Sequence, residues 1–380
     1  MEATVRWLDE QSWDGAFERH WTHLIDLCPT ASIFQTPEWV STWWKHIGSG
    51  RLVFLAVFQG ERLTCLAPFV LKSESRFGIP FTVLALAGEP MADRLGILFD
   101  PSATDGLRAG VRAVVERSRS VDLTRLAEVT MDGPEEEALL DEARRARVPV
   151  TRRAWSRSPV FRLDRPWEEI ERGYPRALRT RLSRARSKQK QAGGLLFRRW
   201  QPQPNELGPL LAELRALEDR SWKGASRIGI FSTKASCDFI GELSDKFARR
   251  GWLDVATLTL GGALVAYRYG FRFRGVFLDY NLAHDPAHTR LAPGRTLLDE
   301  IIRDSHRIGL TAVDASRGRV HPPHLLADWT DDSRWHGLLL LFGPSLRGRA
   351  ISSIERFAKP LARRLLRRKT RSKAKVENDR

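Results

Sequence analysis

The order of elements in residues 253–318 constrains the fold more than any other feature of the sequence. Apolar residues alternate along 253–273, with a Gly261-Gly262 pair in the middle, and a further apolar run follows at 276–282. Gly-Gly between two alternating runs is a strong hairpin signal, so a three-stranded meander is predicted. This part of the chain should therefore form an antiparallel portion of a sheet.

The next predicted element is a helix with an unusual beginning. Apolar residues keep helical spacing over 297–308, and Gly309 follows where a terminating glycine belongs. A helix start that needs only a cap uses one Ser, Thr, Asp or Asn. Glycine beside basic residues favours instead a negative group on the free backbone N–H groups. The residues expected to bind this anion are Arg290, Pro293, Gly294, Arg295 and Thr296.

A short buried strand is predicted after this helix. The apolar sequence LTAV at 310–313 is followed by Asp314, so the strand would place a carboxylate at its end. A meander, an anion-ready turn, a helix and a strand in this order can form an acyl-CoA site, because the helix N–H groups can face a diphosphate.

The first half of the chain repeats part of this design. Residues 52–71 form a predicted strand, a turn and a second strand. A chain of 380 residues is long enough for two domains. The segment 144–160 is basic and carries two prolines, so the chain is predicted to pass from the first domain to the second near residue 150. We therefore expect an α/β (α+β) protein with lobes at 1–150 and 151–345, each a mixed or antiparallel sheet flanked by helices, and a tail at 346–380.

Two further helices can be predicted from their residues. Thr36 as N-cap and Pro37 at the first helical position begin one of them, and Trp39 and Trp43 share its core-facing side. The other, at 174–190, carries seven Lys and Arg opposite an apolar face. Its cations are expected to form a solvated face, with contact to a phosphate-bearing substrate as the alternative.

Composition argues against several classes of protein. Cys28, Cys65 and Cys237 lie far apart without a CxxC pair, which disfavours a disulfide framework or a zinc site and fits a reducing cytoplasm. Pro286 interrupts two histidines at helical spacing, so no metal is expected. Walker, Rossmann and GxSxG patterns are absent, which disfavours the commonest kinases, dehydrogenases and hydrolases.

Charge concentrates in the last part of the chain. The net charge is +16, and residues 346–380 hold 13 Lys and Arg against three acids, or +10 of that total. Apolar residues recur there at helical spacing over 351–365, a basic amphipathic pattern suited to an anionic membrane surface; a solvated arm is the alternative. No signal peptide or membrane span is expected, since strongly apolar runs such as 337–342 are far shorter than the roughly 20 residues that a membrane span requires. We expect a cytoplasmic protein with peripheral contact at the inner membrane face.

The second half resembles GNAT-like acetyltransferases of the CelD/BcsL type. That family carries a tyrosine-bearing strand, a Pro-Gly turn opening a helix, and a strand ending in Asp before a polar loop with Gly. The order and spacing of these segments, together with FQTPEWVSTWW, LRTRLSRARSKQKQAGG and SWKG, cover roughly residues 30–335. The matching residues are Tyr280, Pro293, Gly294, Asp314, Arg317 and Gly318.

The resemblance implies two tandem GNAT-like lobes and an acyltransferase with acetyl-CoA as co-substrate. Relatives include peptidoglycan-bridge transferases that use aminoacyl-tRNA. Direct acyl transfer needs an anchored CoA, an oxyanion donor and a proton acceptor. We expect the oxyanion donor to be a backbone N–H near Leu278–Tyr280. Proton-acceptor candidates are Asp314, Asp279 and Tyr280; substrate-binding candidates are Arg317, Gly318, Arg319, Trp222 and Lys223.

One motif departs from the family pattern. Relatives continue after the loop glycine with Tyr-Lys, whereas this chain has His321 and Pro322 there. If that lysine binds substrate, Arg319 takes its place or the acceptor has changed. Each candidate also has a structural alternative: Asp314 as a loop cap, and Arg317 as a partner of a surface carboxylate.

The sequence thus favours an acyl-CoA-dependent N- or O-acyltransferase acting on a small-molecule or saccharide acceptor in envelope or polysaccharide biosynthesis. Two alternatives stay open. One is an aminoacyl-tRNA-dependent transferase, with the helix at 174–190 gripping the RNA. The other is a non-catalytic scaffold of a polysaccharide assembly complex.

Overall fold

The computed structural model describes residues 2–76, 78–318 and 323–355. The strands are β1 Ala3–Asp9, β2 Arg51–Gln59, β3 Arg62–Arg76, β4 Ile79–Leu86, β5 Leu98–Phe99, β6 Leu123–Thr130, β7 Val150–Arg162, β8 Leu196–Trp200, β9 Leu253–Leu260, β10 Ala263–Phe273, β11 Val276–His284, β12 Ala312–Asp314 and β13 Ser333–Phe342. The α-helices are α1 Gly15–Leu27, α2 Pro37–His46, α3 Thr104–Arg117, α4 Pro134–Arg145, α5 Trp167–Arg172, α6 Arg176–Gln191, α7 Leu207–Arg220, α8 Trp222–Ser226, α9 Lys234–Arg249, α10 Pro293–Arg307 and α11 Leu346–Ser353.

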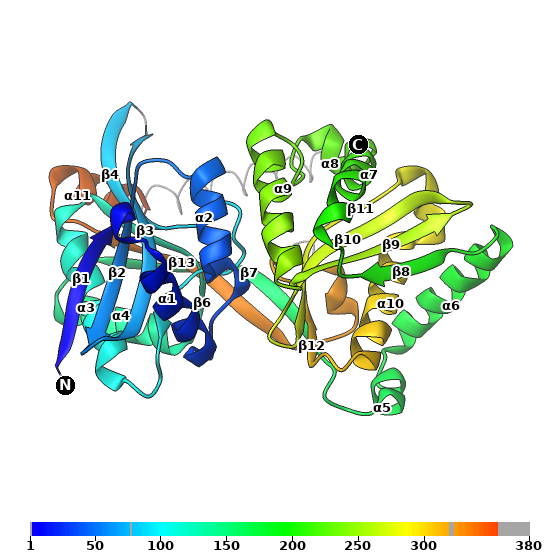
Figure 1. Ribbon diagram of the computed structural model, residues 1–380, viewed down its shortest axis with the longest axis horizontal. Coiled ribbons are helices and arrows are strands. Elements are labelled where there is room, and N and C mark those ends of the chain that lie inside the picture. Colours follow the sequence, from blue (N-terminus) through cyan, green and yellow to red (C-terminus); the bar gives the residue numbers. More distant parts are fainter. Residues whose placement is uncertain (1, 77, 319–322, 356–380) are drawn as a thin grey trace, which may run out of the picture.

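One mixed sheet runs through the described chain. Its order is β1-β2-β3-β4-β6-β13-β7-β12-β11-β10-β9-β8, and β5 pairs with β3. Figure 1 shows two bodies side by side: the first is built on strands β1–β6 and the second on strands β8–β12. Each has helices against its part of the sheet, and β7 and β13 run between them. The predicted fold class, a mixed α/β sheet flanked by helices, is confirmed.

The crossing between the two bodies is a strand. β7 pairs with β13 from Val150 to Pro159 and with β12 from Val160 to Arg162. β13 in turn pairs with β6 of the first body, so the chain returns to the first body after completing most of the second. The predicted boundaries place β13 in the second lobe, and the division into lobes itself stays a prediction.

The second body follows the predicted order of elements. β9, β10 and β11 form the antiparallel meander, with positive φ at both Gly261 and Gly262 in the first turn. α10 begins at Pro293, and Gly309 has φ +78° just after the helix. β12 then ends at Asp314, as expected. Local hydrophobic patterning was sufficient to predict all of these elements.

The faces of this sheet are covered by different helices. Tyr267 and Tyr269 of β10 reach α7 and α9, because their hydroxyls bond Glu218 and Ser244. Arg268, between them on the opposite face, donates to the Gly294 carbonyl at the start of α10. The basic helix α6 also buries its predicted apolar face: Leu178, Leu182 and Ala185.

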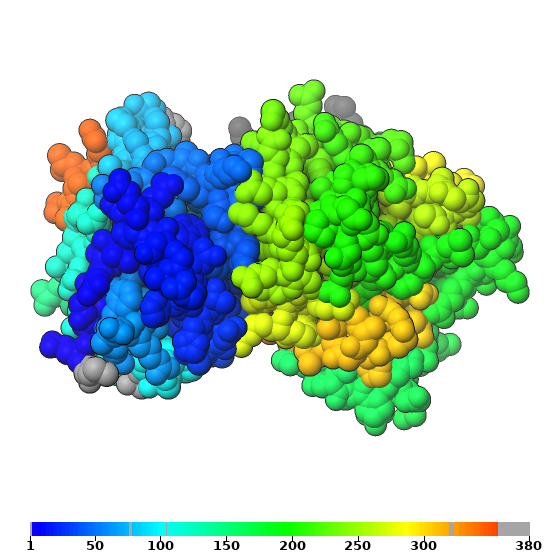
Figure 2. Space-filling model, in the orientation of Figure 1, coloured from blue at the N-terminus to red at the C-terminus, as the bar shows by residue number. Residues whose placement is uncertain are grey.

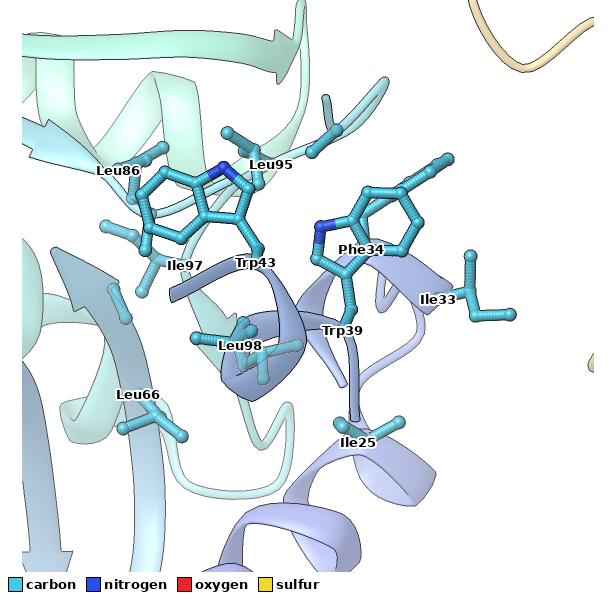
Figure 3. Close-up of a cluster of buried hydrophobic side chains, with 14 of the residues drawn as sticks. Ile25, Ile33, Phe34, Trp39, Trp43, Leu66, Leu86, Leu95, Ile97 and Leu98 are labelled. Carbon is cyan, nitrogen blue, oxygen red and sulfur yellow. The ribbon is translucent and has the colours of Figure 1, made fainter. Parts of the chain in front are cut away.

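The aromatic stripe of α2 lies in the core, as predicted. Thr36 accepts a hydrogen bond from the Trp39 N–H at 3.3 Å, and Pro37 opens the helix. Trp39 and Trp43 are buried, and Figure 3 shows their rings among the aliphatic side chains of the first body. Replacing such a buried tryptophan by alanine typically costs about 3–5 kcal/mol.

Trp39 also joins the two bodies. Its ring packs edge-on against Phe239 of α9, with centroids 5.2 Å apart, and lies 5.7 Å from Tyr280 of β11. Lys45 of α2 forms an ion pair of 2.7 Å with Glu242 of α9. The surfaces of α2 and α9 meet along the front of the molecule (Figure 2). The two bodies therefore share part of one core.

The predicted tail begins with α11. Ile351 of this helix is buried in an apolar cluster with Phe81 and Leu340, and Glu355 is ion-paired with Arg153 at 2.8 Å. The rest of the predicted amphipathic segment, 356–380, lies outside the described residues, as do Arg319, His321 and Pro322.

Candidate active site

The sheet opens between β11 and β12. These parallel strands pair from Val276 to Leu278 and from Ala312 to Asp314, after which β11 continues alone on that side to His284 in the described chain. On its other side, a register shift between Tyr269 and Phe271 of β10 interrupts the ladder. We call the divergence at Leu278 and Asp314 the β11–β12 opening. It coincides with the stretch predicted to hold the oxyanion donor.

The start of α10 follows directly from β11 through a short 3-10 helix. Pro293 has no N–H, and the N–H groups of Arg295 and Thr296 both donate to the Ala292 carbonyl at 3.1 Å. Gly294 donates its N–H to none of the residues that the structure describes. The predicted anchor consisted of the N–H groups of Gly294, Arg295 and Thr296, and in the described chain that of Gly294 is thus left for a ligand.

The side chains at this helix start are engaged to different degrees. Arg295 forms an ion pair with Asp328, and the buried Thr296 accepts a hydrogen bond of 2.6 Å from Gln189 of α6. Arg290 is exposed. Arg295 therefore carries a partly neutralised charge, whereas Arg290 has an accessible one.

Asp279 is buried on the α10 side of the sheet. It forms an ion pair with Arg268, whose guanidinium also donates to the Gly294 carbonyl at 3.1 Å. Burial raises the pKa of the Asp279 carboxyl, although Arg268 opposes that shift. The structure thus ties Asp279 to the position of the α10 start.

Tyr280 lies on the other side, in the seam between the bodies. Its ring packs against Phe34, Trp39 and Phe271, and its hydroxyl donates to the Met91 carbonyl at 2.9 Å. Burial raises the pKa of this phenol well above its usual value. Asp279 and Tyr280 therefore face different surroundings, as their strand positions predicted.

Asp314 meets the first body at the β11–β12 opening. One carboxylate oxygen, Oδ1, pairs with Arg94 and accepts the Ser316 N–H at 2.9 Å. The other, Oδ2, has no hydrogen bond in the described chain, and its nearest cation is Arg334 at 3.7 Å. Asp314 is fully buried, so Oδ2 is an acceptor whose capacity the described residues leave unused.

Arg317 joins the two bodies. Its guanidinium lies 3.2 Å from Asp93, donates to Glu128 at 2.9 Å and also donates to the Ala92 carbonyl. Burial raises the pKa of the Glu128 carboxyl to about 7, although Arg317 opposes that shift. The structure thus favours the ion-pair interpretation of Arg317 over direct substrate contact.

Gly318 is fixed by β7. Its N–H donates to the Ser158 hydroxyl at 2.9 Å, and its carbonyl accepts from Ser156 at 2.8 Å. A Cβ at this position would lie 1.6 Å from the Arg157 carbonyl oxygen, which only glycine avoids. Packing therefore requires glycine at position 318, and its N–H is hydrogen-bonded to Ser158 rather than left for a substrate.

The SWKG segment, residues 221–224, contacts β11 through Lys223. Lys223 of α8 contacts the Asn281 side-chain oxygen, and Asn281 donates to the buried Glu218 at 2.8 Å. A Cβ on Gly224 would come within 2.2 Å of the Asp219 carbonyl, so glycine is required there too. Trp222 is 43% exposed. The network positions the Lys223 ammonium, while Trp222 is free to contact a ligand.

Several functional-site residues were missed from the sequence. Arg268, the ion-pair partner of the predicted Asp279, is a charge inside an apolar strand, and that position is a usable signal. Arg94 and Arg334 gave no comparable signal because they lie far from Asp314 in the sequence.

Among the described residues, no three His, Cys, Asp or Glu side chains are grouped as metal ligands would be. Within the same residues, each helix is too short or too polar to span a bilayer.

Comparison with known proteins supports the interpretation of the second body. A family model described as an acetyltransferase (GNAT) domain matches residues 176–321. No curated protein matches the chain in sequence. The narrower resemblance to the CelD/BcsL type stays a prediction.

Solved structures match nearly the whole chain. The crystal structure of FemX aligns with a TM-score of 0.60 and 11% identity, over 90% of this chain and 97% of its own. A conserved protein of unknown function from Bacteroides thetaiotaomicron VPI-5482 aligns with a TM-score of 0.55 and 11% identity, over 86% and 97%. The C-terminal domain of a putative lysylphosphatidylglycerol synthetase from Agrobacterium fabrum aligns with a TM-score of 0.50 and 13% identity, over 77% of this chain and 86% of its own.

At these identities the solved structures establish the fold alone. The family model covers the stretch from α6 through β12, which contains the β11–β12 opening and the start of α10. Residues 176–321 thus match a GNAT acetyltransferase domain, within a chain that shares the fold of FemX.

Proposed function

We propose that the protein is an acyl-CoA-dependent N- or O-acyltransferase, with acetyl-CoA as the expected donor and a small-molecule or saccharide acceptor of envelope or polysaccharide biosynthesis. The observation that carries this proposal is the place of Gly294. It is the second residue of α10, the helix that connects β11 to β12, and these two strands diverge at Leu278 and Asp314. An unpaired helix N–H beside a sheet opening suits a donor whose diphosphate and thioester must both be held.

The residues present fit a CoA diphosphate at the α10 start. A Cβ on Gly294 would meet only the His284 ring nitrogen, at 3.8 Å, so the space in front of this backbone is open. The Gly294 N–H and the exposed Arg290 guanidinium would hold the diphosphate. This anchor is narrower than the one expected from the sequence, because the N–H groups of Arg295 and Thr296 are already bonded. Bound acyl-CoA supplies a thioester carbonyl that is open to attack by an amine or hydroxyl.

In this proposal the protein contributes two groups to the chemistry. A backbone N–H of β11 near Leu278–Tyr280, where the ladders are interrupted, stabilises the developing oxyanion. Asp314 Oδ2 accepts the proton of the acceptor group while Arg94 holds Oδ1. The new bond forms between the acceptor N or O and the acyl carbon, the C–S bond breaks, and the thiolate leaves.

Asp279 and Tyr280 have other roles under this mechanism. The Tyr280 hydroxyl already donates to a backbone carbonyl, which disfavours it as a base. Asp279 is a positioning residue, because it holds Arg268 against the Gly294 carbonyl. Lys223 lies near the same strand and is proposed to contact the substrate, with Trp222 beside it.

A second candidate is favoured by the surface of α6. Arg181 and Arg186 pair with Asp328 and Asp299, whereas five further cations of this helix have no carboxylate partner in the described chain. The five cations are Arg176, Arg179, Arg184, Lys188 and Lys190. Such a face suits a polyanion, as an aminoacyl-tRNA-dependent transferase requires.

Calorimetric titration of the full chain with acetyl-CoA, free CoA and a charged tRNA separates the candidates. Binding of acetyl-CoA and CoA without tRNA supports the proposed donor. Binding of tRNA alone supports the aminoacyl-tRNA alternative. No binding of any of the three contradicts both and favours a non-catalytic scaffold.

A further inference from the structure

A cavity of about 530 Å³ lies between the two bodies. Most of its wall is apolar. The first body contributes Leu86, Leu126 and Leu139, and the second contributes Phe273, Val276 and Leu278. Cavities of this size, with an apolar wall and a few converging polar groups, are the usual binding sites of small molecules. No part of the mechanism above uses this space.

The charged residues of the cavity wall are three arginines, Arg94, Arg274 and Arg334, and two glutamates, Glu135 and Glu136; Glu136 is ion-paired with Arg152, which does not line the cavity. Arg94 and Arg334 both line it, and in the described chain Asp314 is the carboxylate that lies within 4 Å of either. The Arg94 Nε atom is buried without a hydrogen-bond partner among those residues, as is Asp314 Oδ2. Arg94 and Asp314 are buried, with side chains 10% and 1% exposed, whereas the Arg334 side chain is 49% exposed. Leaving polar atoms of a buried ion pair unsatisfied is costly.

A buried histidine feels the charge of these arginines but does not line the cavity. His336 lies two residues beyond Arg334 on β13, on the same side of the strand, and is fully buried. Neither of its ring nitrogens has a partner in the described chain. Buried polar groups are normally satisfied, so the unused Arg94 Nε and Asp314 Oδ2 indicate that a further molecule completes the network at the cavity wall.

The cavity adjoins the β11–β12 opening. Leu278 both lines the cavity and is the last residue of β11 paired with β12, and its partner there is Asp314. Asp314 is bonded to Arg94 of the cavity wall. A molecule in the cavity would therefore lie next to the carboxylate proposed to accept a proton.

We propose that this cavity seats the acyl acceptor, and that the acceptor is an organic anion. Its apolar body would fill the cavity, and one carboxylate or phosphate would lie against Arg334 and Arg94. This inference rests on the proposed acyltransfer and narrows its acceptor class. A bare sugar fits poorly, because the apolar wall would leave most of its hydroxyl groups unpaired.

Titration of the full chain with octanoate, octyl phosphate and octanol tests the inference. We expect at least one of the two anions to bind at least tenfold more tightly than octanol, and the better anion identifies the head group. Equal affinity for octanol and both anions would overturn the proposal, because the arginines would then contribute nothing.

Three variants locate the binding. Arg334→Gln should weaken the preferred anion at least tenfold and leave octanol unchanged. Arg162→Gln is the matched control, since Arg162 is 60% exposed on β7 and does not line the cavity. An equal loss in both variants would show non-specific charge attraction and would contradict the site.

Gly96→Leu should abolish binding of all three probes by filling the cavity. Gly96 lines it, and a Cβ there meets only Gln35 and Glu135, at 3.7 and 4.0 Å, so the variant should fold. Retained binding in a folded Gly96→Leu protein would place the probes elsewhere and refute the inference.

Acetyl-CoA titration of the same proteins separates this inference from the proposed function. If the unmodified chain binds the anion but does not bind acetyl-CoA, only the donor assignment is contradicted. Acetyl-CoA binding without any anion binding would leave the donor assignment intact and overturn the acceptor site.

Discussion

Arg94 and Asp314 form a buried ion pair across 220 residues of sequence, and this pair connects the end of β12 to the first body. Removing one member leaves the other charged and desolvated. The pair is therefore both a structural link between the bodies and a means of orienting the proposed catalytic carboxylate.

The first prediction concerns this pair. Arg94→Gln should lower the free energy of unfolding by about 3–5 kcal/mol, because Asp314 stays buried without its cation. Arg94→Met combined with Asp314→Leu should be less destabilising than Arg94→Gln alone. Urea unfolding of the unmodified protein and the two variants checks this, and a double variant no more stable than Arg94→Gln would contradict the prediction.

A second prediction concerns the donor anchor. Gly294→Val should abolish binding of CoA and leave the fold intact, because the side chain would occupy the open space in front of the helix N–H. Gly208→Val is a matched control: Gly208 also lies near a helix start, in α7, with no atom within 4 Å of an added Cβ. Calorimetry should show normal CoA affinity in the control; normal affinity in folded Gly294→Val would refute the anchor.

The third prediction is a pH dependence of stability. Burial lowers the pKa of His336 from 6.5 to about 2, with Arg94, Arg334 and Arg317 adding to the effect. Below pH 6.5 the His336 imidazole is protonated in the unfolded chain but stays neutral in the folded chain. This residue alone should therefore lower the free energy of unfolding by about 1.4 kcal/mol for each pH unit below 6.5. The contribution is fully present above pH 6.5.

His336→Leu should therefore reduce the loss of stability between pH 7 and pH 5, as measured by chemical unfolding at each pH. His23→Leu is the control, because His23 is exposed. An unchanged pH slope in His336→Leu would show that this imidazole is protonated in the folded protein.

A fourth prediction concerns the mechanism. Cys28 and Cys65 are buried, and burial raises the pKa of Cys65 and of Cys237, so none of the three thiols is poised as a nucleophile. A triple Cys→Ala protein should keep its turnover if it folds. Mass spectrometry should find no acylated cysteine after mixing with acetyl-CoA, and a trapped acyl-cysteine would overturn direct transfer.

The last prediction concerns the tail. Because Ile351 and Glu355 pack against the first body, the chain should be shortened after Glu355 rather than before α11. The shortened protein should lose binding to anionic liposomes at low salt and keep its acetyl-CoA affinity. If the full chain does not bind such liposomes, its cations act only as a solvated arm.

The sequence by itself determined the local elements. Alternation and turn glycines specified the β9–β10–β11 meander, and helical spacing between Pro293 and Gly309 specified α10. These features depend on interactions between residues close in the chain, which patterning records directly. The anion-ready helix start at Gly294 was predicted on the same basis.

Only the tertiary structure decided which side chains meet. The pairing of Asp314 with Arg94, and of Arg317 with Asp93 and Glu128, joins residues whose partners leave no periodic trace in the sequence. The return of β13 to the first body, which places Arg334 beside Asp314, likewise depends on long-range strand pairing. Long-range burial, rather than local propensity, determines whether a polar residue is free to bind a ligand or holds the fold together.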